Sequence, residues 1–386
     1  MAPQRASGTR RRFQVALLIE TSNAFAREVL LGVRDWMEAH DTWAVHLSEQ
    51  GRGNEPPGWL RHWQGHGIIA RVETREIAAA VRRRNVPVVN VSAAGVTEEF
   101  PTVISDSAGI ARAAAEHLRE RGLRQFGYCG DARFAWSESH GRHFAALVSR
   151  WGCTCQTYPA AVDDAADWDR EQEKLRAWLR VLPRPCGVMV CYDIRGQQVL
   201  DVCRALGLRV PDDLAVIGQH NDALLCELCN PPLSSVIPNA RQVGWEAAAM
   251  LDRWMHGRAP RVKRLEIPPL GVATRQSTDL VAVGDERLAR AARYIREHYR
   301  QPFMVDELAR AAGLSRSLLE RNYRAAFGLA PWEHVLKLRL RDAEALLVQT
   351  RWSVAEIAER TGFGAAAYFS AAFRRLTGRP PSALRG

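Results

Sequence analysis

Two stretches near the C-terminus repeat one spacing of small and aliphatic residues, and that spacing suits the recognition of nucleic-acid bases. In the first stretch a Leu-Ala pair at 308–309 precedes Gly313, and a second amphipathic segment follows. In the second stretch an Ile-Ala pair at 357–358 precedes Gly362 in the same way. The alanine lets two helices cross closely, and glycine supplies the left-handed backbone that ends the first helix. This pattern is typical of a helix-turn-helix unit, whose second helix lies in the major groove of DNA.

The two stretches are copies of one unit. The residues at 331–349, between the two units, are apolar at helical spacing, which predicts a helix about 28 Å long. Such a helix would hold two recognition helices about one DNA turn apart. A helical interaction domain without DNA binding is the alternative. The equivalent pairs are Leu308 and Ile357, Gly313 and Gly362, Leu319 and Phe369, Tyr323 and Phe373, Gly328 and Gly378, and Pro331 and Pro381.

Roughly the last hundred residues resemble the AraC/XylS family of transcription regulators. The matching segments are Gly-Leu-Ser-Arg-Ser-x-Leu-x-Arg-x-Tyr at 313–323, Gly-Phe-x-x-x-x-Tyr-Phe-x-x-x-Phe-Arg-Arg at 362–375, and Thr-Gly-Arg-Pro-Pro-Ser-Ala-Leu-Arg at 377–385. The resemblance implies a DNA-binding domain over residues 286–386. By position in the motif, the expected DNA-binding residues are Arg316, Ser317, Glu320 and Arg321 in the first unit, and Ala367, Tyr368 and Ala371 in the second.

The second unit departs from the common pattern of that family. Ala371 stands where many members carry Arg or another polar residue, and residues 365–367 are all alanine. Because alanine has no hydrogen-bonding group, we expect this unit to contact mostly the DNA backbone and thymine methyl groups.

The charge of the chain agrees with a polyanionic partner. The chain has 386 residues, enough for two to three domains, and a net charge of +10. Residues 281–386 hold eighteen Arg or Lys against eleven Asp or Glu, so about a quarter of the length carries most of the excess. Charge alone would fit a basic, solvated surface equally well. No apolar run is long enough to span a bilayer, so no membrane partner is expected.

The N-terminus and the cysteines argue for a cytoplasmic protein without a metal or cofactor. Residues 1–12 include Arg5 and three consecutive arginines but no apolar segment before a cleavage site. We expect a disordered basic tail; an arm that binds phosphates or the minor groove is the alternative. Cys226 and Cys229 have no second pair at zinc spacing, and the other six cysteines are scattered.

From Phe13 to about Asp279 short aliphatic runs alternate with amphipathic segments, which predicts an α/β domain with parallel sheets. The length, 13–280, favours two lobes. The expected strands are Gln14–Ile19, Trp43–Leu47, Gly67–Ala70, Val86–Val91, Thr102–Ser105, Gln125–Cys129, Gly187–Cys191 and Leu214–Gly218. The expected helices include Ala24–Ala39, Thr74–Arg84, Asp106–Arg121, Ser137–Trp151, Asp167–Val181, Arg195–Leu206 and Ala240–Met255.

This region resembles the LacI/GalR-type sugar-sensing domain, a relative of periplasmic binding proteins. The residues that carry the resemblance lie at 22–33, 105–107, 116–122, 207–218, 232–236 and 275–279. The N-terminal DNA-binding headpiece of that family is absent, so DNA binding would fall to the C-terminal module. Over nearly the whole chain this fusion is similar to xylose-responsive regulators of the AraC type, and the block Pro232–Ala248 makes that similarity specific.

Ligands of open α/β sheets bind beyond the carboxyl ends of the strands, so the loops there supply the candidate site. A pyranose needs convergent polar groups for its hydroxyls and an aromatic face for its C–H groups. Asp106 and Asp193 both precede expected helices and could instead be N-caps. The candidates for hydroxyl binding are Asn23, Asp106, Asp193, Arg195 and Asn221, and those for stacking are Phe25 and Trp136.

Two histidines depart from what the resemblance implies. His220 stands where relatives usually have Asp, and His140 stands where relatives often have Arg. A neutral imidazole offers one donor and one acceptor, whereas Asp offers only acceptors and Arg only donors. We therefore expect both residues in the effector site with an altered hydroxyl pattern. Solvent-facing loop positions are the alternative.

These observations favour a ligand-controlled transcription regulator, most simply an activator that responds to xylose or a related pentose. The expected partners are operator DNA, a second copy of the chain and RNA polymerase, and the joint between the two domains is expected at 281–285. No nucleophile elbow, phosphate loop or metal motif indicates an enzyme. The alternative is a cytoplasmic sugar-binding protein whose helical C-terminal domain is a protein-interaction module.

The fragment 281–386 should bind duplex DNA by itself, with an affinity that falls steeply as salt rises, because binding releases cations from the phosphates. Electrophoretic mobility shifts over a salt series measure this dependence. Failure to bind at the lowest salt concentration would contradict the interpretation of the C-terminal domain.

Overall fold

The computed structural model describes residues 12–40, 42–51, 55–160, 168–280, 285–349 and 352–384. They form two compact units, of which the first ends at Leu280. The tail expected at 1–12 and the joint expected at 281–285 lie outside the described residues, except for Arg12 and Asp285. Within the described part of the chain, no helix is both long and apolar enough to cross a membrane.

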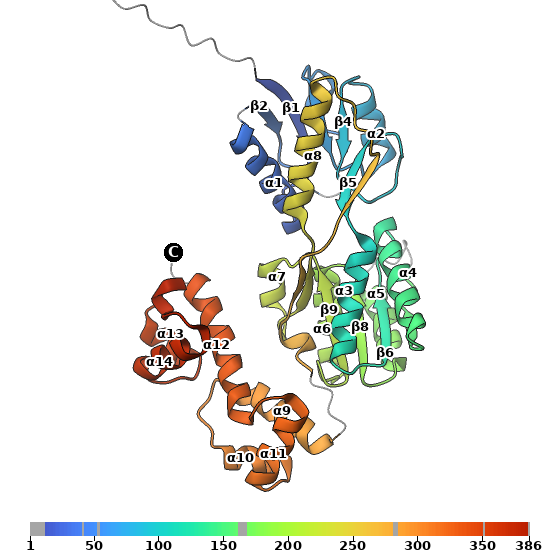
Figure 1. Cartoon of the computed structure of the whole chain (residues 1–386). Helices are drawn as coiled ribbons and strands as arrows, with labels where there is room; N and C mark the ends of the chain where they lie inside the picture. The colour runs from blue at the N-terminus through green and yellow to red at the C-terminus, as the bar shows by residue number, and fades with distance from the viewer. Residues whose placement is uncertain are drawn as a thin grey trace, which may run out of the picture. The chain divides into compact units, whose positions relative to one another are not determined.

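The first unit consists of two lobes, each built on a six-stranded sheet (Figure 1). In lobe 1 all strand pairs are parallel; in lobe 2 only the pair of β10 and β12 is antiparallel. The strand order in lobe 1 is β11 (Arg264–Ile267), β5 (Thr102–Ser105), β4 (Val88–Asn90), β3 (Gly67–Ala70), β1 (Phe13–Leu18) and β2 (Trp43–Leu47). The order in lobe 2 is β12 (Gly271–Ala273), β10 (Ser234–Ile237), β9 (Leu214–Gln219), β8 (Cys186–Val190), β6 (Gln125–Cys129) and β7 (Thr154–Thr157).

Helices cover these sheets as expected for parallel βαβ units. Lobe 1 contains α1 (Ala24–His40), α2 (Arg75–Arg82), α8 (Ala240–Met255) and the short helix η1 (Gly58–Arg61). Lobe 2 contains α3 (Ser107–Glu120), α4 (Ala135–Arg150), α5 (Trp168–Val181), α6 (Asp193–Ala205), α7 (Ala223–Leu228) and η3 (Gln276–Thr278). The two-lobed α/β fold is therefore confirmed, and so are the eight expected strands and seven expected helices, with ends shifted by at most two residues.

Four strands were missed by the sequence analysis, namely β7, β10, β11 and β12. Each has only three or four residues, and in β7, β10 and β11 polar side chains interrupt the apolar run, as in Thr-Cys-Gln-Thr for β7. Three of the four, β7, β11 and β12, are edge strands, and β10 lies next to β12. Runs this short give too few residues for an alternating pattern to be recognised.

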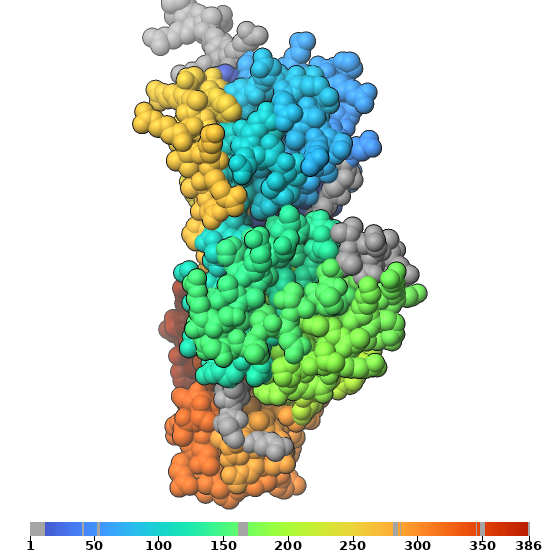
Figure 2. Space-filling model, turned by 90° about the vertical axis from the view of Figure 1, so that its right-hand side faces the viewer, coloured from blue at the N-terminus to red at the C-terminus, as the bar shows by residue number. Residues whose placement is uncertain are grey.

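The chain crosses between the lobes three times, and lobe 1 is therefore assembled from two distant segments. The crossings join β5 to α3, β10 to α8, and β11 to β12. Figure 2 shows the consequence: yellow atoms, which come from residues around 240–265, lie against the blue and cyan atoms of the N-terminal part of the chain. Three connections leave the lobes free to open and close about a hinge.

A close helix crossing ties the two segments of lobe 1 together. A Cβ on Gly32 of α1 would lie 1.9 Å from the backbone oxygen of Arg241, and one on Gly244 of α8 would lie 1.9 Å from that of Val29. The two backbones thus touch at residues that have no side chain. Around the crossing, Val33, Val243 and other buried aliphatic residues form one core.

The second unit is all helical and holds two cores that share one long helix. Its helices are α9 (Glu286–His298), α10 (Val305–Ala312), α11 (Arg316–Phe327), α12 (Pro331–Gln349), α13 (Val354–Arg360), α14 (Ala366–Thr377) and η4 (Pro381–Leu384). In α12, Val335 and Leu338 pack into the core of α9, α10 and α11, whereas Leu336 and Leu340 pack into the core of α13 and α14. The predicted 331–349 helix is confirmed, and it connects two helix-turn-helix units.

Local chemistry sets the ends of these helices. Gly313 ends α10 with φ of 66°, the left-handed backbone that the sequence predicts there, and Ser315 then caps α11. In the second helix-turn-helix unit Gly362 has φ of 82°, and Ser353 forms a capping box with Glu356 at the start of α13.

The α1–α8 crossing generates a stability prediction. Gly244→Ala should destabilise the first unit, residues 12–280 (called the sensor unit below), by about 1–3 kcal/mol, because the new methyl group has to push apart two packed backbones. Gly58→Ala is the matched control, since a Cβ there meets no atom within 4 Å. Urea unfolding of both variants measures the difference. Equal stability of the two variants would show that the crossing adjusts without cost.

Candidate functional site

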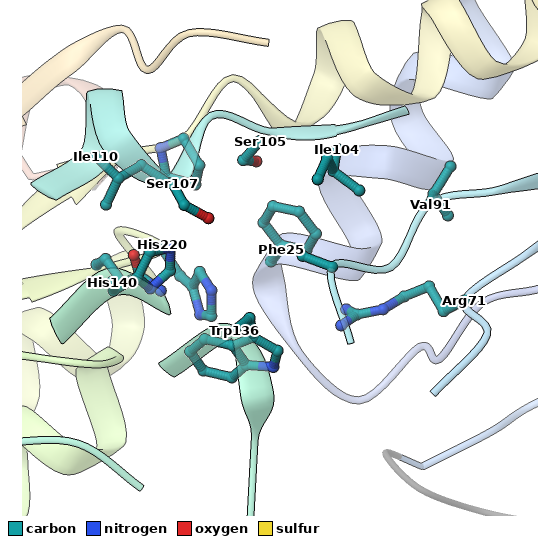
Figure 3. Close-up of a pocket in the computed structure, with 13 residues that line it drawn as sticks. Phe25, Arg71, Val91, Ile104, Ser105, Ser107, Ile110, Trp136, His140 and His220 are labelled. Carbon is teal, nitrogen blue, oxygen red and sulfur yellow. The ribbon is translucent and has the colours of Figure 1, made fainter. Parts of the chain in front are cut away.

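A pocket with an empty volume of about 490 Å³ lies between the two lobes. Figure 3 shows Phe25 and Arg71 on one side and Trp136, His140 and His220 facing them. The pocket therefore occupies the carboxyl ends of the strands, where the sequence analysis places the effector site. The lining residues are Phe25, Arg71, Val91, Ala93, Ile104, Ser105, Ser107, Ile110, Trp136, His140, Gln219, His220 and Pro238.

Aromatic rings form one part of the lining. Phe25 comes from α1 of lobe 1 and Trp136 from α4 of lobe 2, and the ring of His220 lies 5.2 Å from the first and 6.0 Å from the second. His220 itself has φ of 96°, a backbone conformation that non-glycine residues rarely adopt. These rings offer flat apolar faces of the kind that pack against the C–H groups of a sugar.

Five buried polar atoms of the lining have no hydrogen-bond partner among the described residues. Three belong to uncharged side chains, Oγ of Ser105, Nδ1 of His140 and Oε1 of Gln219, and two are Nε and Nη1 of Arg71. His140 is 4% exposed and Gln219 is 1% exposed, so bulk water does not satisfy them. A buried polar atom without a partner costs about 1–3 kcal/mol. The pocket is thus prepared for a ligand that carries both donors and acceptors.

His140 enters this arrangement as a neutral ring. Burial lowers its pKa to about 4, so the imidazole is uncharged at neutral pH and offers one donor and one acceptor. The alternative that His140 faces solvent is wrong, because its side chain is buried on α4. His220 likewise lines the pocket rather than an open loop.

Arg71 supplies positive charge next to the pocket, and the sequence analysis missed it. Its guanidinium forms ion pairs with Glu20, at 3.0 Å, and with Glu73, and it lies 5.4 Å from the ring centroid of Phe25. The paired charges leave the site without a free ion that would select a charged ligand. Arg71 directly follows β3, so its position at a strand's carboxyl end was the available signal.

Two of the predicted effector-binding residues cap helices and lie outside the pocket lining. Asp106 accepts a hydrogen bond from the backbone N–H of Gly109 and is the N-cap of α3, the alternative that the sequence left open. Asn23 accepts one from Ala26 at the start of α1. The residues on either side of Asp106, Ser105 and Ser107, line the pocket instead.

Asp193 also lies outside the lining, and it is not an N-cap. Its two carboxylate oxygens accept from Oγ of Ser235, at 2.6 Å, and from the backbone N–H of Asp222, at 2.8 Å. Burial raises the pKa of Asp193 to about 7. Both carboxylate oxygens of Asp193 thus bond to protein donors within lobe 2, and the side chain is not among those that line the pocket.

Asn221, a further candidate, faces away from the cleft. It has φ of 50°; its backbone N–H donates to Ser235, and its Oδ1 accepts from Nη1 of Arg275 at 2.9 Å. Gln219 and His220, on the same loop, face the pocket instead. Of the two residues that the sequence named on this loop, His220 lines the pocket and Asn221 does not.

Arg195 is used for packing within lobe 2. Its guanidinium pairs with Glu171, donates to Oε1 of Gln198 at 3.0 Å and lies 5.1 Å from the ring centroid of Tyr158. The side chain is only 4% exposed and does not line the cleft pocket. Arg195 is the third residue of α6 and lies beyond the loop at the end of β8, which explains why its side chain does not line the pocket.

Hydrogen bonds connect the pocket loop to the end of the sensor unit. Arg275, which holds Asn221, also donates through Nε to Glu227 at 2.7 Å. Three residues later, Thr278 bonds Nε2 of His117 and Oγ of Ser234, each at 2.7 Å. The last helical turn of this unit is therefore fastened to the loop that carries His220.

The second unit presents the predicted DNA-binding residues on its surface. Ser317, Glu320 and Arg321 are exposed on α11, and Ala367, Tyr368 and Ala371 are exposed on α14. Arg316, also exposed, pairs with Glu320 at 3.3 Å and with Asp306 at 3.8 Å. The inward faces of both helices carry the buried Leu319, Tyr323, Phe369 and Phe373.

Comparison with known protein families agrees with this division of the chain. A model described as the XylR N-terminal domain matches residues 14–106, one described as a periplasmic binding protein-like domain matches 115–278, and a helix-turn-helix domain model matches 308–386. The family matches cover both lobes of the sensor and both helix-turn-helix units.

Relatives match this chain over nearly its whole length. The xylose operon regulatory protein of Escherichia coli is 29% identical over 97% of both chains, and that of Haemophilus influenzae is 26% identical over 98% of this chain and 99% of its own. The solved structure of the xylose-binding transcription activator xylR has a TM-score of 0.77 at 29% identity, and the match covers 97% of this chain and 98% of that chain. Over nearly its whole length the chain is therefore similar to xylose operon regulatory proteins, and it joins a XylR-type, periplasmic-binding-protein-like domain to a helix-turn-helix domain.

Proposed function

We propose that the chain is a transcription activator whose DNA binding is controlled by a neutral monosaccharide, xylose in the first place. The observation that carries the proposal is the interlobe pocket, which combines aromatic rings with unpartnered buried polar atoms of the uncharged side chains of Ser105, His140 and Gln219 and two unpartnered nitrogens of Arg71. Relatives that are named for xylose match nearly the whole chain and support the choice of sugar.

The pocket chemistry fits an uncharged polyol. The neutral imidazole of His140, the amide oxygen of Gln219 and the hydroxyl of Ser105 together provide donors and acceptors without a net charge. The nearby positive charge of Arg71 is paired with two carboxylates, those of Glu20 and Glu73, so this group carries no net positive charge. A sugar phosphate or sugar acid would bring an anion that meets no unpaired cation in this lining.

The mechanism is a population shift between arrangements of the two lobes. A sugar that touches residues from both lobes favours the closed arrangement by its differential affinity. Closure moves the loop of His220, and Arg275 and Thr278 connect that loop to the end of the sensor unit. The linkage then changes the affinity for operator DNA, and DNA changes the affinity for sugar by the same factor.

This proposal treats the protein as a cytoplasmic regulator and not as an enzyme. The pocket lining offers no carboxylate pair for acid–base work, and its polar groups suit binding. RNA polymerase is the expected partner of an activator. The alternative is a sugar-binding protein with an interaction module, and exposed polar residues on two helix-turn-helix units argue against it.

Two measurements on the full chain test the function. Calorimetric titration with xylose, arabinose, glucose and xylitol identifies the sugar, and mobility shifts on DNA selected from random duplexes, with and without that sugar, measure the linkage. Sugar binding without any sequence-selective DNA binding would favour the alternative. Sequence-selective binding that no sugar alters would remove the effector role.

The assembly on DNA is a separate expectation. Two protomers should occupy one operator through contacts of their sensor units, as direct or inverted repeats, because a dimer doubles the DNA contacts for one ligand signal. Light scattering of the full chain, alone and with operator DNA, gives the mass. A monomer under both conditions would contradict it.

Gln219 provides the sharpest test of the pocket. Gln219→Leu keeps the size of the side chain but leaves one sugar hydroxyl unpaired in a buried site, so xylose affinity should fall about tenfold to a hundredfold. Gln125→Leu, at the N-terminal end of β6 and outside the pocket lining, is the matched control and should bind as the wild type does. Calorimetry measures both variants. Unchanged affinity in Gln219→Leu would place the ligand elsewhere.

A further inference from the structure

The two recognition helices differ in what they can offer to DNA. In a helix-turn-helix unit the exposed residues in the first half of the second helix contact base edges. On α11 these residues provide a hydroxyl, a carboxylate and a guanidinium, from Ser317, Glu320 and Arg321. On α14 the equivalent positions carry Ala367, Ser370 and Ala371; the two alanines are exposed and offer only a methyl, whereas Ser370 is half-buried.

The outward face of α14 is apolar although it is exposed. Tyr368, between the two alanines, is 44% exposed, which is high for a large aromatic residue on a folded surface. The same helix buries Phe369, Ala372 and Phe373 on its inner side, so its fold does not require Tyr368, Ala367 or Ala371 to be apolar. An exposed apolar strip of this kind indicates a binding surface.

The charges around this strip favour nucleic acid over a protein partner. Arg374 and Arg375 are exposed in the last turn of α14, and Arg379 follows it. The helix itself carries no acidic residue. Cations that flank an apolar strip match phosphates that flank the floor of a major groove, where the thymine C5-methyl is the only apolar group of the bases.

The backbone before α14 allows a close approach. Gly364 has φ of 74°, and Ala365 is an N-cap without a side-chain hydrogen bond. Small residues therefore surround the N-terminal end of the helix, which is the end that enters the groove. Methyl groups of alanine can then come within about 4 Å of thymine methyl groups, the range of apolar contact.

We propose that the second helix-turn-helix unit recognises its half of the operator by apolar contact with thymine methyl groups, through Ala367, Tyr368 and Ala371, whereas the first unit reads base edges by hydrogen bonds. This inference rests on the proposed DNA-binding function. It assigns α14 a specificity for the position of methyl groups, without regard to which base carries them.

The test begins with duplexes that the full chain selects from a random pool in the presence of its sugar. Arg321→Ala identifies the half that α11 reads, because discrimination there is lost. In the other half, each thymine is replaced by uracil, which lacks only the methyl. One contacted thymine should account for about a fourfold loss of affinity, equivalent to ~0.8 kcal/mol. In a second series, a selected thymine is exchanged for cytosine, and this duplex is compared with one that has 5-methylcytosine at the same position. The methyl group should raise the affinity by a similar factor.

A variant connects the methyl effect to the helix. In Ala371→Asn the amide should read an adenine edge instead, and the loss on replacing thymine by uracil should disappear at one position. Ala383→Asn, an exposed residue of η4 outside the strip, is the matched control and should keep that loss.

The outcomes separate this inference from the proposed function. If no sequence is selected, the DNA-binding function fails. If both halves are selected but uracil and 5-methylcytosine change nothing in the second half, regulation of DNA binding stands and methyl recognition is wrong. If uracil weakens binding equally in both halves, the difference between α11 and α14 is wrong.

Discussion

The buried carboxylate of Asp193 fixes the loop on which the sensing function depends. It accepts hydrogen bonds from Ser235 and from the backbone of Asp222, and so it joins the start of α6, the end of β9 and the strand β10. Burial disfavours its charged form, and each of these donors offsets part of that cost. The positive φ values of His220 and Asn221 show that the loop takes a rare conformation, which needs such anchors.

Residues of the same loop contact both the pocket and Arg275, near the end of the first unit. The loop therefore connects the pocket to the segment that precedes the DNA-binding helices. His220 and Gln219 line the pocket, whereas Asn221 bonds Arg275 on the far side. A shift of the loop therefore cannot leave Arg275 and the turn of Thr278 unaffected without breaking buried hydrogen bonds. Buried networks of this kind have few alternative arrangements, which suits a switch with two states.

The sequence predicted the helix-turn-helix units and the main strands because their signals are local: periodic apolar residues, glycines at helix ends and repeated spacing. The pocket was predicted only to the level of loops. Phe25, Trp136, His140 and His220 lie in the lining, but Asp106 and Asn23 cap helices and Asn221 faces away. Which of two adjacent residues turns toward a cleft depends on strand ends and tertiary partners. The short strands at the sheet edges escaped for the same reason, since neighbours rather than composition define them.

The division of lobe 1 into two segments has a consequence for how the protein is made. The strands β1 to β5 leave the ribosome long before α8, which packs on α1, and β11, which pairs with β5. At about 5–20 residues per second, roughly 7 to 30 s separate the end of β5 from the start of α8. During that time the glycine face of α1 and one edge of the sheet are uncovered. Lobe 2 also waits for β12 and η3. Translation thus finishes both lobes almost together, immediately before the DNA-binding helices emerge, so a nascent chain stalled earlier holds neither a complete sensor nor a means of binding an operator.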